Sequence, residues 1–351
     1  MHGMHGSGGG GERPKASTIR AKTSGGGVEG HPRRWWALAV IDVCLLVVTM
    51  DNTILNVALP TISRQLGASG SQLQWMVDAY IVVFAGLLLT AGTLGDRLGR
   101  RRMLLAGLSV FGLASAATVF VSNPDQLIVI RGVMGLGGAL LMPATLSLIT
   151  NLFSEKERPR AIATWAAVSG VGMVLGPIVG GLLLESFSWN AVFLVNLPIV
   201  AVGLAGTVLL MPESRDAHPD RLDPVGAVLS IAGLATLVFG IIEAPGAGWT
   251  APETFLRVGV GLGLLVAFGL WELHNTTPMF DIRLFARPGF GPTSFAETVA
   301  HFALVGGMFA LTQYLQFVWG QRPLQAGLSM LPVAFGVVAG SMAATKLMPR
   351  I

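Results

Sequence analysis

The stretch GTLGDRLGRRRM, residues 92–103, lies between two long apolar segments of the sequence. It concentrates glycines and charges, namely Gly92, Gly95, Asp96, Arg97, Gly99, Arg100 and Arg101. Gly95 and Gly99 permit a tight turn, because glycine adopts backbone conformations that other residues avoid. Asp96 can cap the helix that follows or pair with Arg97 or Arg100. The stretch therefore predicts a short, basic turn between two apolar helices.

The composition outside this turn indicates a membrane protein. Of the 351 residues, 52% are hydrophobic and 12% are charged, whereas soluble domains carry about 25% charged residues. About 20 apolar residues in a helix cross a hydrocarbon layer of about 30 Å. Cys44 is the only cysteine, which excludes an intramolecular disulfide and a cysteine metal cluster.

Ten apolar segments follow one another along the chain and predict ten transmembrane helices in an all-α integral membrane fold. They lie at about 36–59, 73–95, 103–121, 126–150, 160–184, 191–211, 224–243, 254–272, 290–319 and 325–348. Asp223-Pro224 supplies an N-cap and a proline first turn for the seventh segment. The motif Glu243-Ala-Pro-Gly is expected to end this segment.

The basic residues set the orientation of these segments. With the N-terminus inside, 19 of the 23 Lys and Arg residues fall on the inner side, and only Arg64, Arg257 and Arg322 fall on the outer side. This bias predicts a cytoplasmic N-terminus. The net charge of +4 is explained by topology and contact with anionic lipid, so no nucleic-acid partner is predicted.

A few charged side chains fall within the apolar segments, where each costs at least about 2.5 kcal/mol. They are Asp42, Asp51, Asp78, Arg131 and Glu297, with His301 beside the last. From the helical rise, Asp51 lies roughly 12 Å below the outer end of its segment, and Asp78 and Arg131 lie about 8–9 Å deep. If these three face a common cavity, one carboxylate can pair with Arg131 while the other carries a proton.

Other interpretations of these charges remain open. Asp51 and Arg131 can form a buried ion network that only locks helices together, and Asp78 can be solvated near the interface. Asp42 and Glu297 lie in the inner half, about 9–12 Å from the cytoplasmic face. Asp42 is half a turn out of phase with Asp51, so the two do not share a face. Glu297 and His301 share a face, either as a proton step or as an interhelical hydrogen-bond site.

Several motifs, taken together, resemble the major facilitator superfamily. GTLGDRLGRRRM resembles the loop between the second and third helices of that family. The resemblance implies that this stretch is a cytoplasmic gating loop. LIVIRGVMGLGGA (127–139) resembles its fourth-helix motif with a buried arginine, here Arg131. This chain has Met134 where the family often has glutamine.

Three further motifs point to a subfamily. GVGMVLGPIVGG (170–181) resembles the fifth-helix antiporter motif. Its residues are Gly172, Gly176, Pro177, Gly180 and Gly181, and the glycines at every fourth position allow close helix packing. Tight packing without function also explains them. MDNTILNVALP (50–60) resembles the first-helix motif of the fourteen-helix drug:proton antiporters. WMVDAY (75–80) resembles exporters of quaternary ammonium compounds and other lipophilic cations.

The resemblance covers residues 36 to 348 and implies a domain organisation. Residues 1–34 are expected to form a disordered cytoplasmic tail, 35–212 an N-terminal six-helix bundle, and 213–223 a cytoplasmic linker. Residues 224–274 are expected to form an inserted helix pair, and 275–351 the first two helices of an incomplete C-terminal bundle. The resemblance thus implies that the chain is C-terminally truncated, with a natural ten-helix carrier as the alternative.

The implied function is proton-coupled efflux. We expect a multi-pass cell-membrane antiporter that uses the proton gradient, takes no cofactor or metal, and exports a small lipophilic cation by alternating access. Asp51, Asp78 and Arg131 are the expected coupling residues, and Asp42, Glu297 and His301 the expected inner lining. The alternatives are export of an endogenous metabolite or antibiotic, and a non-transporting membrane fragment or interaction partner. The sequence shows no nucleophile elbow or phosphate loop, so an enzyme is not predicted.

Overall fold

A computed structural model describes residues 32–215, 222–275, 278, 280–333, 335–336 and 339–340. The regular structure of these residues is entirely helical. The predicted tail therefore lies outside the described residues except for its last three positions. Part of the predicted linker also lies outside them.

The first six apolar segments form seven helices, α1 to α7. Their bounds are α1 (Arg34–Leu66), α2 (Gly70–Leu98), α3 (Arg100–Ala117), α4 (Pro124–Leu152), α5 (Arg158–Ser186), α6 (Ala191–Leu194) and α7 (Asn196–Leu210). The remaining helices are α8 (Pro224–Ala247), α9 (Pro252–His274), α10 (Phe290–Gln313), which continues into a π-helical turn at Tyr314–Val318, and α11 (Pro323–Ser329). Short 3₁₀ turns lie at Thr118–Phe120 and Ile282–Ala286.

Within the described residues, nine helical segments are long and apolar enough to cross a membrane. They correspond to the first nine predicted segments, with α6 and α7 together forming the sixth. The tenth predicted segment, 325–348, begins in α11, and much of its second half lies outside the described residues.

The helix ends follow local sequence signals. Asp223 caps α8 as predicted, because its side chain accepts a hydrogen bond from the Gly226 N–H. The predicted end of α8 at Glu243 is wrong, since the helix continues to Ala247 with Pro245 inside it. A proline lacks one backbone donor, and this loss affects only the final turn before Gly248, whose φ of +101° closes the helix.

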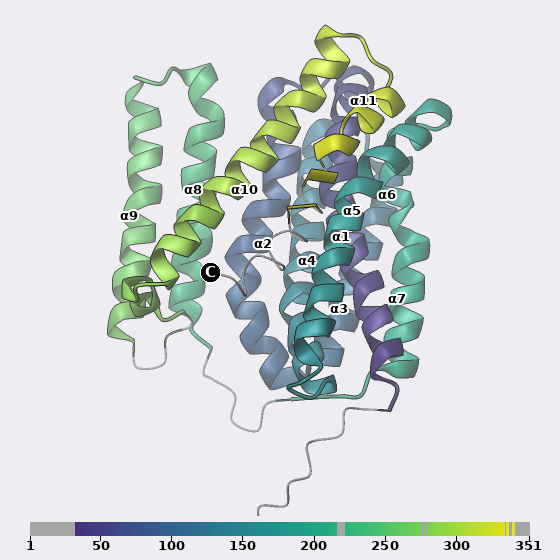
Figure 1. The fold of residues 1–351 in the computed structure, drawn as a ribbon. Coiled ribbons are helices and arrows are strands. Elements are labelled where there is room, and N and C mark those ends of the chain that lie inside the picture. Colours follow the sequence, from purple (N-terminus) through teal and green to yellow (C-terminus); the bar gives the residue numbers. More distant parts are fainter. Residues whose placement is uncertain are drawn as a thin grey trace, which may run out of the picture.

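Helices α1 to α7 pack into one bundle with α1 at its centre, in contact with α4, α5 and α7 (Figure 1). The α8–α9 hairpin stands beside α2 and contacts no other helix of this bundle as extensively. There the Trp75 Nε1–H donates to Glu243 (3.4 Å), and the Trp75 ring lies 5.8 Å from the Phe239 ring.

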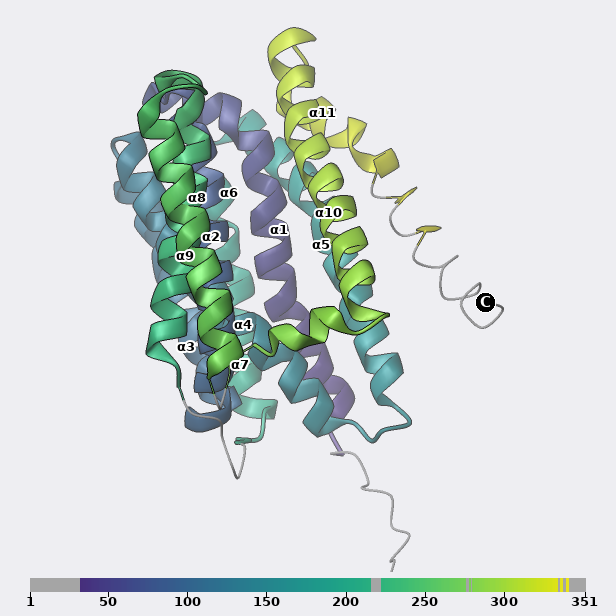
Figure 2. The ribbon, with the colours of Figure 1, turned by 90° about the vertical axis from the view of Figure 1, so that its left-hand side faces the viewer.

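Helix α10 crosses the bundle obliquely and touches it at the outer end (Figures 1 and 2). The Gln316 side chain donates to the Val57 carbonyl at 3.1 Å, and Met308 and Met330 pack near Met173 of α5. The inner half of α10 is instead exposed, and the Phe302 side chain is 79% accessible. The contact between α10–α11 and the bundle is therefore closed on the outer side and open on the side predicted to be cytoplasmic.

The cytoplasmic end of the α8–α9 hairpin depends on Asp223, which is 7% exposed. It accepts hydrogen bonds from the Gly226 N–H (2.8 Å), Trp271 Nε1 (2.7 Å) and Asn275 Nδ2 (2.8 Å). Burial raises the pKa of this carboxyl, but these hydrogen bonds together outweigh burial and lower it.

We expect Asp223→Ala to reduce the stability of the purified chain by about 1–2 kcal/mol, as for the loss of a helix cap. Because the folded-state pKa is lowered, the contribution is fully present above the unfolded pKa of about 3.9. It is lost as pH falls through the folded value. Thermal unfolding in detergent from pH 7 to pH 3 measures this, with the exposed Glu253→Ala as control. Parallel pH profiles for Asp223→Ala and the unsubstituted chain would contradict the assignment.

Candidate functional site

Asp51 and Arg131 form a buried ion pair at the centre of the bundle. The Arg131 Nη1 lies 2.5 Å from the Asp51 Oδ2, and the two side chains are 1% and 0% exposed. The Arg131 Nε also donates to the Met76 carbonyl of α2 at 2.9 Å. The predicted pairing of Arg131 with one carboxylate thus occurs with Asp51.

The pair is surrounded by polar groups from three other helices. The Asn196 Nδ2 of α7 donates to the Asp51 Oδ1 at 2.9 Å and lies 3.4 Å from the Ser115 hydroxyl of α3. The Tyr80 ring of α2 lies under the guanidinium, 4.6 Å from its Cζ to the ring centroid. Charges and dipoles from α1, α2, α3, α4 and α7 therefore meet at one point.

Glycines on α4 allow α2 to approach this network. A methyl group added at Gly135 would collide with the Tyr80 carbonyl, and one at Gly138 would meet the Tyr80 hydroxyl. The close approach brings both the Met76 carbonyl and the Tyr80 ring into contact with the Arg131 guanidinium. The sequence of α4 thus positions Arg131 as well as supplying it.

Because the pair is enclosed, it holds helices together in this conformation. A buried ion pair loses much of its Coulomb energy to desolvation, but removing one partner leaves an uncompensated charge in a low dielectric. Neither side chain is accessible to a ligand here. A role in coupling for Asp51 and Arg131 therefore requires another conformation.

Asp78 lies apart from this pair. Asp78 is two positions along α2 from both Met76 and Tyr80, so its side chain points about 200° around the helix from theirs. The Asp78 side chain is half-buried, and among the described residues it makes no hydrogen bond or ion pair. The structure thus brings two of the three predicted coupling residues together and leaves the third as an unpaired carboxylate.

The predicted inner-half residues also separate. Asp42 is buried, 8% exposed, and its Oδ1 has no hydrogen-bond partner within the described part of the chain. Asp51 faces α4 and α7, so the half-turn between the two acids directs Asp42 elsewhere. Glu297 and His301 are exposed on the inner half of α10, and no hydrogen bond joins them to each other.

The loop at residues 92–103 forms a tight turn between α2 and α3. Of the alternatives for Asp96, the structure shows pairing with Arg100, at 3.0 Å from Nε and 2.7 Å from Nη2. Gly99 has φ of +112°, and a Cβ there would collide with the Glu213 carboxylate. The positive φ favours glycine at this position, and the Glu213 side chain would have to move aside for any other residue.

Residues in the last turn of α7 and just after it hold this loop in place. The Arg101 Nη2 donates to the Val208 carbonyl at 2.7 Å, and the Arg100 N–H donates to the Ser214 carbonyl at 3.0 Å. Arg102 lies 3.6 Å from Glu213. Arg97 is exposed, and Gly92 and Gly95 pack near Pro143 and Met103.

The fifth-helix motif forms two contact surfaces. Gly172, Gly176 and Gly180 pack against Thr49, Thr53 and Ile54 of α1. Gly181 faces the backbone of Leu324 at the start of α11, and the Pro177 carbonyl faces Gly327. This motif therefore joins α5 both to the central helix and to the outer contact with α11.

Sequence reasoning missed Asn196, Ser115 and Tyr80. Asn196 is the strongest signal among them, because it is a fully buried amide inside the predicted segment 191–211. Buried amides need a partner, and a carboxylate at similar depth is a suitable one. Ser115 and Tyr80 give little signal in the sequence, because small hydroxyls and tyrosines are common in apolar helices.

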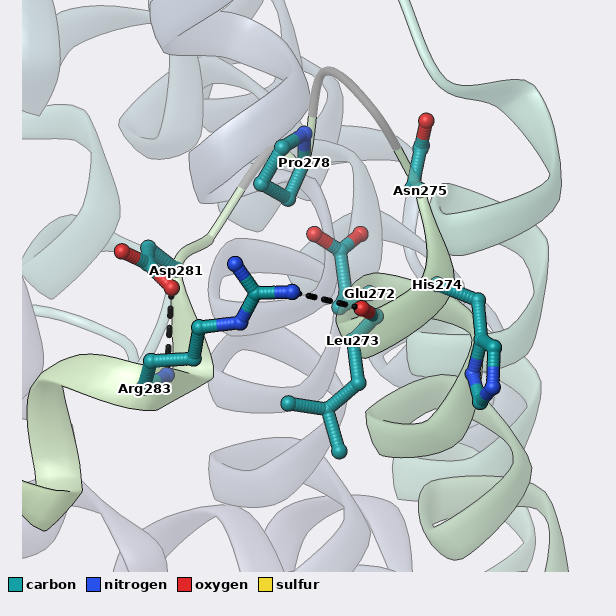
Figure 3. A pocket seen from close by; sticks show the side chains of 7 residues that line it. All are labelled: Glu272, Leu273, His274, Asn275, Pro278, Asp281 and Arg283. Atoms are coloured by element: carbon teal, nitrogen blue, oxygen red, sulfur yellow. Dashed lines mark hydrogen bonds between the residues drawn. The ribbon is translucent and has the colours of Figure 1, made fainter.

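A pocket lies at the cytoplasmic end of α9, away from the ion pair (Figure 3). In it the Arg283 Nη2 donates to the Leu273 carbonyl at 3.1 Å, and the Asp281 carboxylate accepts from the Arg283 N–H. The Glu272 carboxylate accepts from the Phe280 N–H at 3.0 Å. These bonds shape the connection between α9 and α10. Within the described residues, no three His, Cys, Asp or Glu side chains are grouped to hold a metal.

Solved structures of transporters share this fold. A peptide transporter POT in complex with sulfate superposes with a TM-score of 0.59, at 16% identity, over 93% of this chain and 71% of that one. The POT family transporter PepTSo gives 0.56 at 16% identity, over 92% and 71%. The helices and these neighbours define the class: a multi-pass membrane protein with the helical fold of these transporters.

The family follows from the sequence comparisons. The sequence model of a protein family, described as Major Facilitator Superfamily, matches residues 41–351 of this chain. The chain belongs to the Major Facilitator Superfamily, which confirms the resemblance found in its motifs.

Its relatives include resistance proteins from several bacteria. The multidrug efflux pump LfrA of Mycolicibacterium smegmatis is 41% identical over 92% of this chain and 66% of its own length. The puromycin resistance protein pur8 of Streptomyces alboniger is 37% identical over 91% and 64%. The methyl viologen resistance protein SmvA of Salmonella typhimurium is 38% identical over 86% and 61%. The chain thus spans 61% to 66% of the lengths of these relatives.

Proposed function

We propose that the chain acts in drug efflux, as a proton-coupled antiporter that exports lipophilic or quaternary ammonium cations. The observation that carries this proposal is Asp78, a half-buried carboxylate without a partner among the described residues, on a helix next to a fully neutralised ion pair. Asp51 is already compensated by Arg131. Asp78 is therefore a carboxylate of the outer half of the bundle that is free to take a proton or a cation.

Competition between a proton and an organic cation for the Asp78 carboxylate couples the flux of protons to the flux of the cation. A carboxylate in an apolar helix is costly when bare, and either a proton or an organic cation removes that cost. A proton that arrives from outside displaces the cation, and loss of the proton to the cytoplasm restores the site. Arg131, paired with Asp51, also binds the Met76 carbonyl of α2, and so helps to position the helix that carries Asp78.

The names of the relatives support a cationic substrate. SmvA is named for resistance to methyl viologen, which is an organic dication, and LfrA is named as a multidrug efflux pump. Loose selectivity for such compounds suits a lining rich in methionine and aromatic side chains. The substrate is thus proposed to be an apolar cation whose charge is met by Asp78.

Alternating access is proposed to follow from two bundles that rock about their contact. In this proposal residues 35–212 form one bundle, 213–223 the linker, 224–274 the inserted pair, and 275–351 the first helices of the other bundle. The outer contact of α5 with α11, and the exposed inner half of α10, support an inward-facing state. Arg97 and Arg100 in the loop at 92–103 would gate the cytoplasmic side.

We expect Asp78→Asn to reduce proton-driven uptake of ethidium into inverted membrane vesicles at least tenfold, because the amide carries no charge. Asp78→Glu keeps the carboxylate and is expected to retain measurable flux. Glu253→Gln, an exposed carboxylate at the outer end of α9, is the control and should match the unsubstituted chain. Flux from Asp78→Asn equal to that of the unsubstituted chain would remove this residue from the mechanism.

A second candidate is export of an antibiotic or of an endogenous metabolite. The tetracenomycin C resistance and export protein of Streptomyces glaucescens is 33% identical over 92% of this chain. Transport of a neutral compound does not need the Asp78 charge, so export that survives Asp78→Asn would favour this candidate. Absence of any flux, together with stable association with another membrane protein, would favour a non-transporting partner.

A further inference from the structure

On α1 and α5, two buried polar atoms have no hydrogen-bond partner among the described residues. One is the Oδ1 of Asp42 on α1, and the other is the indole Nε1 of Trp165 on α5. Asp42 is 92% buried by accessible area, since 8% of it is exposed. A carboxylate in this position is costly without a compensating group.

The packing of α1 on α5 places these two residues at the same level. Arg34 pairs with Glu157 at 2.9 Å, and higher up Thr49 faces Gly172 and Thr53 faces Gly176. The two residue numbers differ by 123 in each case (157 − 34, 172 − 49 and 176 − 53). Asp42 and Trp165 also differ by 123 (165 − 42), so we infer that they lie at the same level of the two helices.

The two side chains also lie on the facing sides of their helices. Asp42 precedes Thr49 by seven residues, and Trp165 precedes Gly172 by seven, which is close to two full turns. Because Thr49 and Gly172 touch, residues two turns below them face each other as well. Asp51 is on the opposite side of α1, so Asp42 and the central ion pair are separate features.

The chemistry of the two groups suits an organic cation. A carboxylate compensates the positive charge, and the face of an indole attracts a cation by its ring quadrupole, which is strongest for tryptophan. Trp165 is half-buried, so part of its ring is accessible. A proton alone would neutralise Asp42 but would leave the indole unused.

The contacts of α10 with the bundle lie nearer the outer end than this level. Contacts of α10 and its extension with α1 and α5 involve Val57 and Met173, which lie nearer the outer end than Asp42 and Trp165. The inner half of α10 is exposed at Phe295 and Phe302. A cation that comes from the cytoplasm thus meets this level before it reaches that of Asp78.

We propose that Asp42 and Trp165 form an inner subsite that binds the cationic group of a lipophilic cation between α1 and α5. The direction of transport that this subsite serves rests on the proposed function, but binding itself does not. Two separate measurements therefore distinguish failure of the subsite from failure of the efflux proposal.

The test is equilibrium binding of ethidium to the purified full chain in detergent, followed by fluorescence anisotropy. We expect Asp42→Asn and Trp165→Leu each to weaken binding about tenfold. Trp165→Phe should weaken it less, because it keeps an aromatic face. The double variant Asp42→Asn/Trp165→Leu should be little weaker than either single variant, since groups that act on one ligand atom are not additive. Glu155→Gln and Trp36→Phe, both exposed, should match the unsubstituted chain.

Controls separate binding from folding. Asp42→Glu keeps the charge and should retain binding, and Nile red, a neutral dye, should bind the Asp42→Asn variant as well as it binds the unsubstituted chain. Binding of ethidium to Asp42→Asn within twofold of the unsubstituted value overturns the subsite, as does absence of binding to the unsubstituted chain. Loss of binding in Asp42→Asn without any vesicle flux in the unsubstituted chain supports the subsite and counts against the efflux proposal.

Discussion

Replacing Arg131 with alanine is expected to destabilise the purified chain by about 3–5 kcal/mol, because it leaves the Asp51 carboxylate buried without its partner. The substitution also frees the Met76 carbonyl and removes the cation from the Tyr80 ring. Thermal unfolding in detergent, followed by size-exclusion chromatography, measures the loss. Arg257→Ala removes an arginine that pairs with the exposed Glu253, and it should cost less than about 1 kcal/mol.

A double variant decides between the two interpretations of this ion pair. Asp51→Asn/Arg131→Gln removes both charges and leaves groups that can still form hydrogen bonds, so it should recover most of the lost stability. If it also transports ethidium as well as the unsubstituted chain, the pair only locks helices. If it is stable and inactive, the pair takes part in coupling in another conformation. A double variant as unstable as Arg131→Ala would contradict the assignment of the loss to an uncompensated charge.

Substitution of Gly176 by alanine is expected to cost about 1–3 kcal/mol, as for overpacking of a tight interface. The added methyl group would meet the Thr53 hydroxyl and also the backbone of Met50 and Ile54. Backbone atoms of a central helix cannot move aside without shifting α1. Thermal unfolding in detergent measures the effect, with Gly263→Ala as control, since a methyl group added there would meet no atom within 4 Å outside the backbone of its own helix.

The neighbouring Gly172 gives a sharper comparison. There the nearest atoms belong to the side chains of Thr49 and Leu46, so Thr49→Ala should partly rescue Gly172→Ala. Thr53→Ala should not rescue Gly176→Ala, because the backbone contacts remain. Equal rescue at both positions would show that side chains, and not the helix backbone, set the distance between α1 and α5.

The sequence was sufficient to predict the apolar helices and the charges that matter most. A helix of membrane length is recognised from about 20 consecutive residues, and a charge inside it is conspicuous because of its cost. Asp51 and Arg131 were found in this way. Asn196 and Ser115 were not, because neutral polar groups cost less and do not stand out against an apolar helix.

Depth in the membrane was determined by the sequence, and partnership was decided by the tertiary structure. Counting residues from the ends of each helix placed Asp51, Asp78 and Arg131 at similar heights, since the rise per residue is constant. The structure joins Asp51 to Arg131 and leaves Asp78 apart. Which side chains meet at a given height depends on how each helix is rotated and on which helix lies beside it. Both are set by contacts between segments far apart in the chain, such as α1 with α4, and no single segment encodes them.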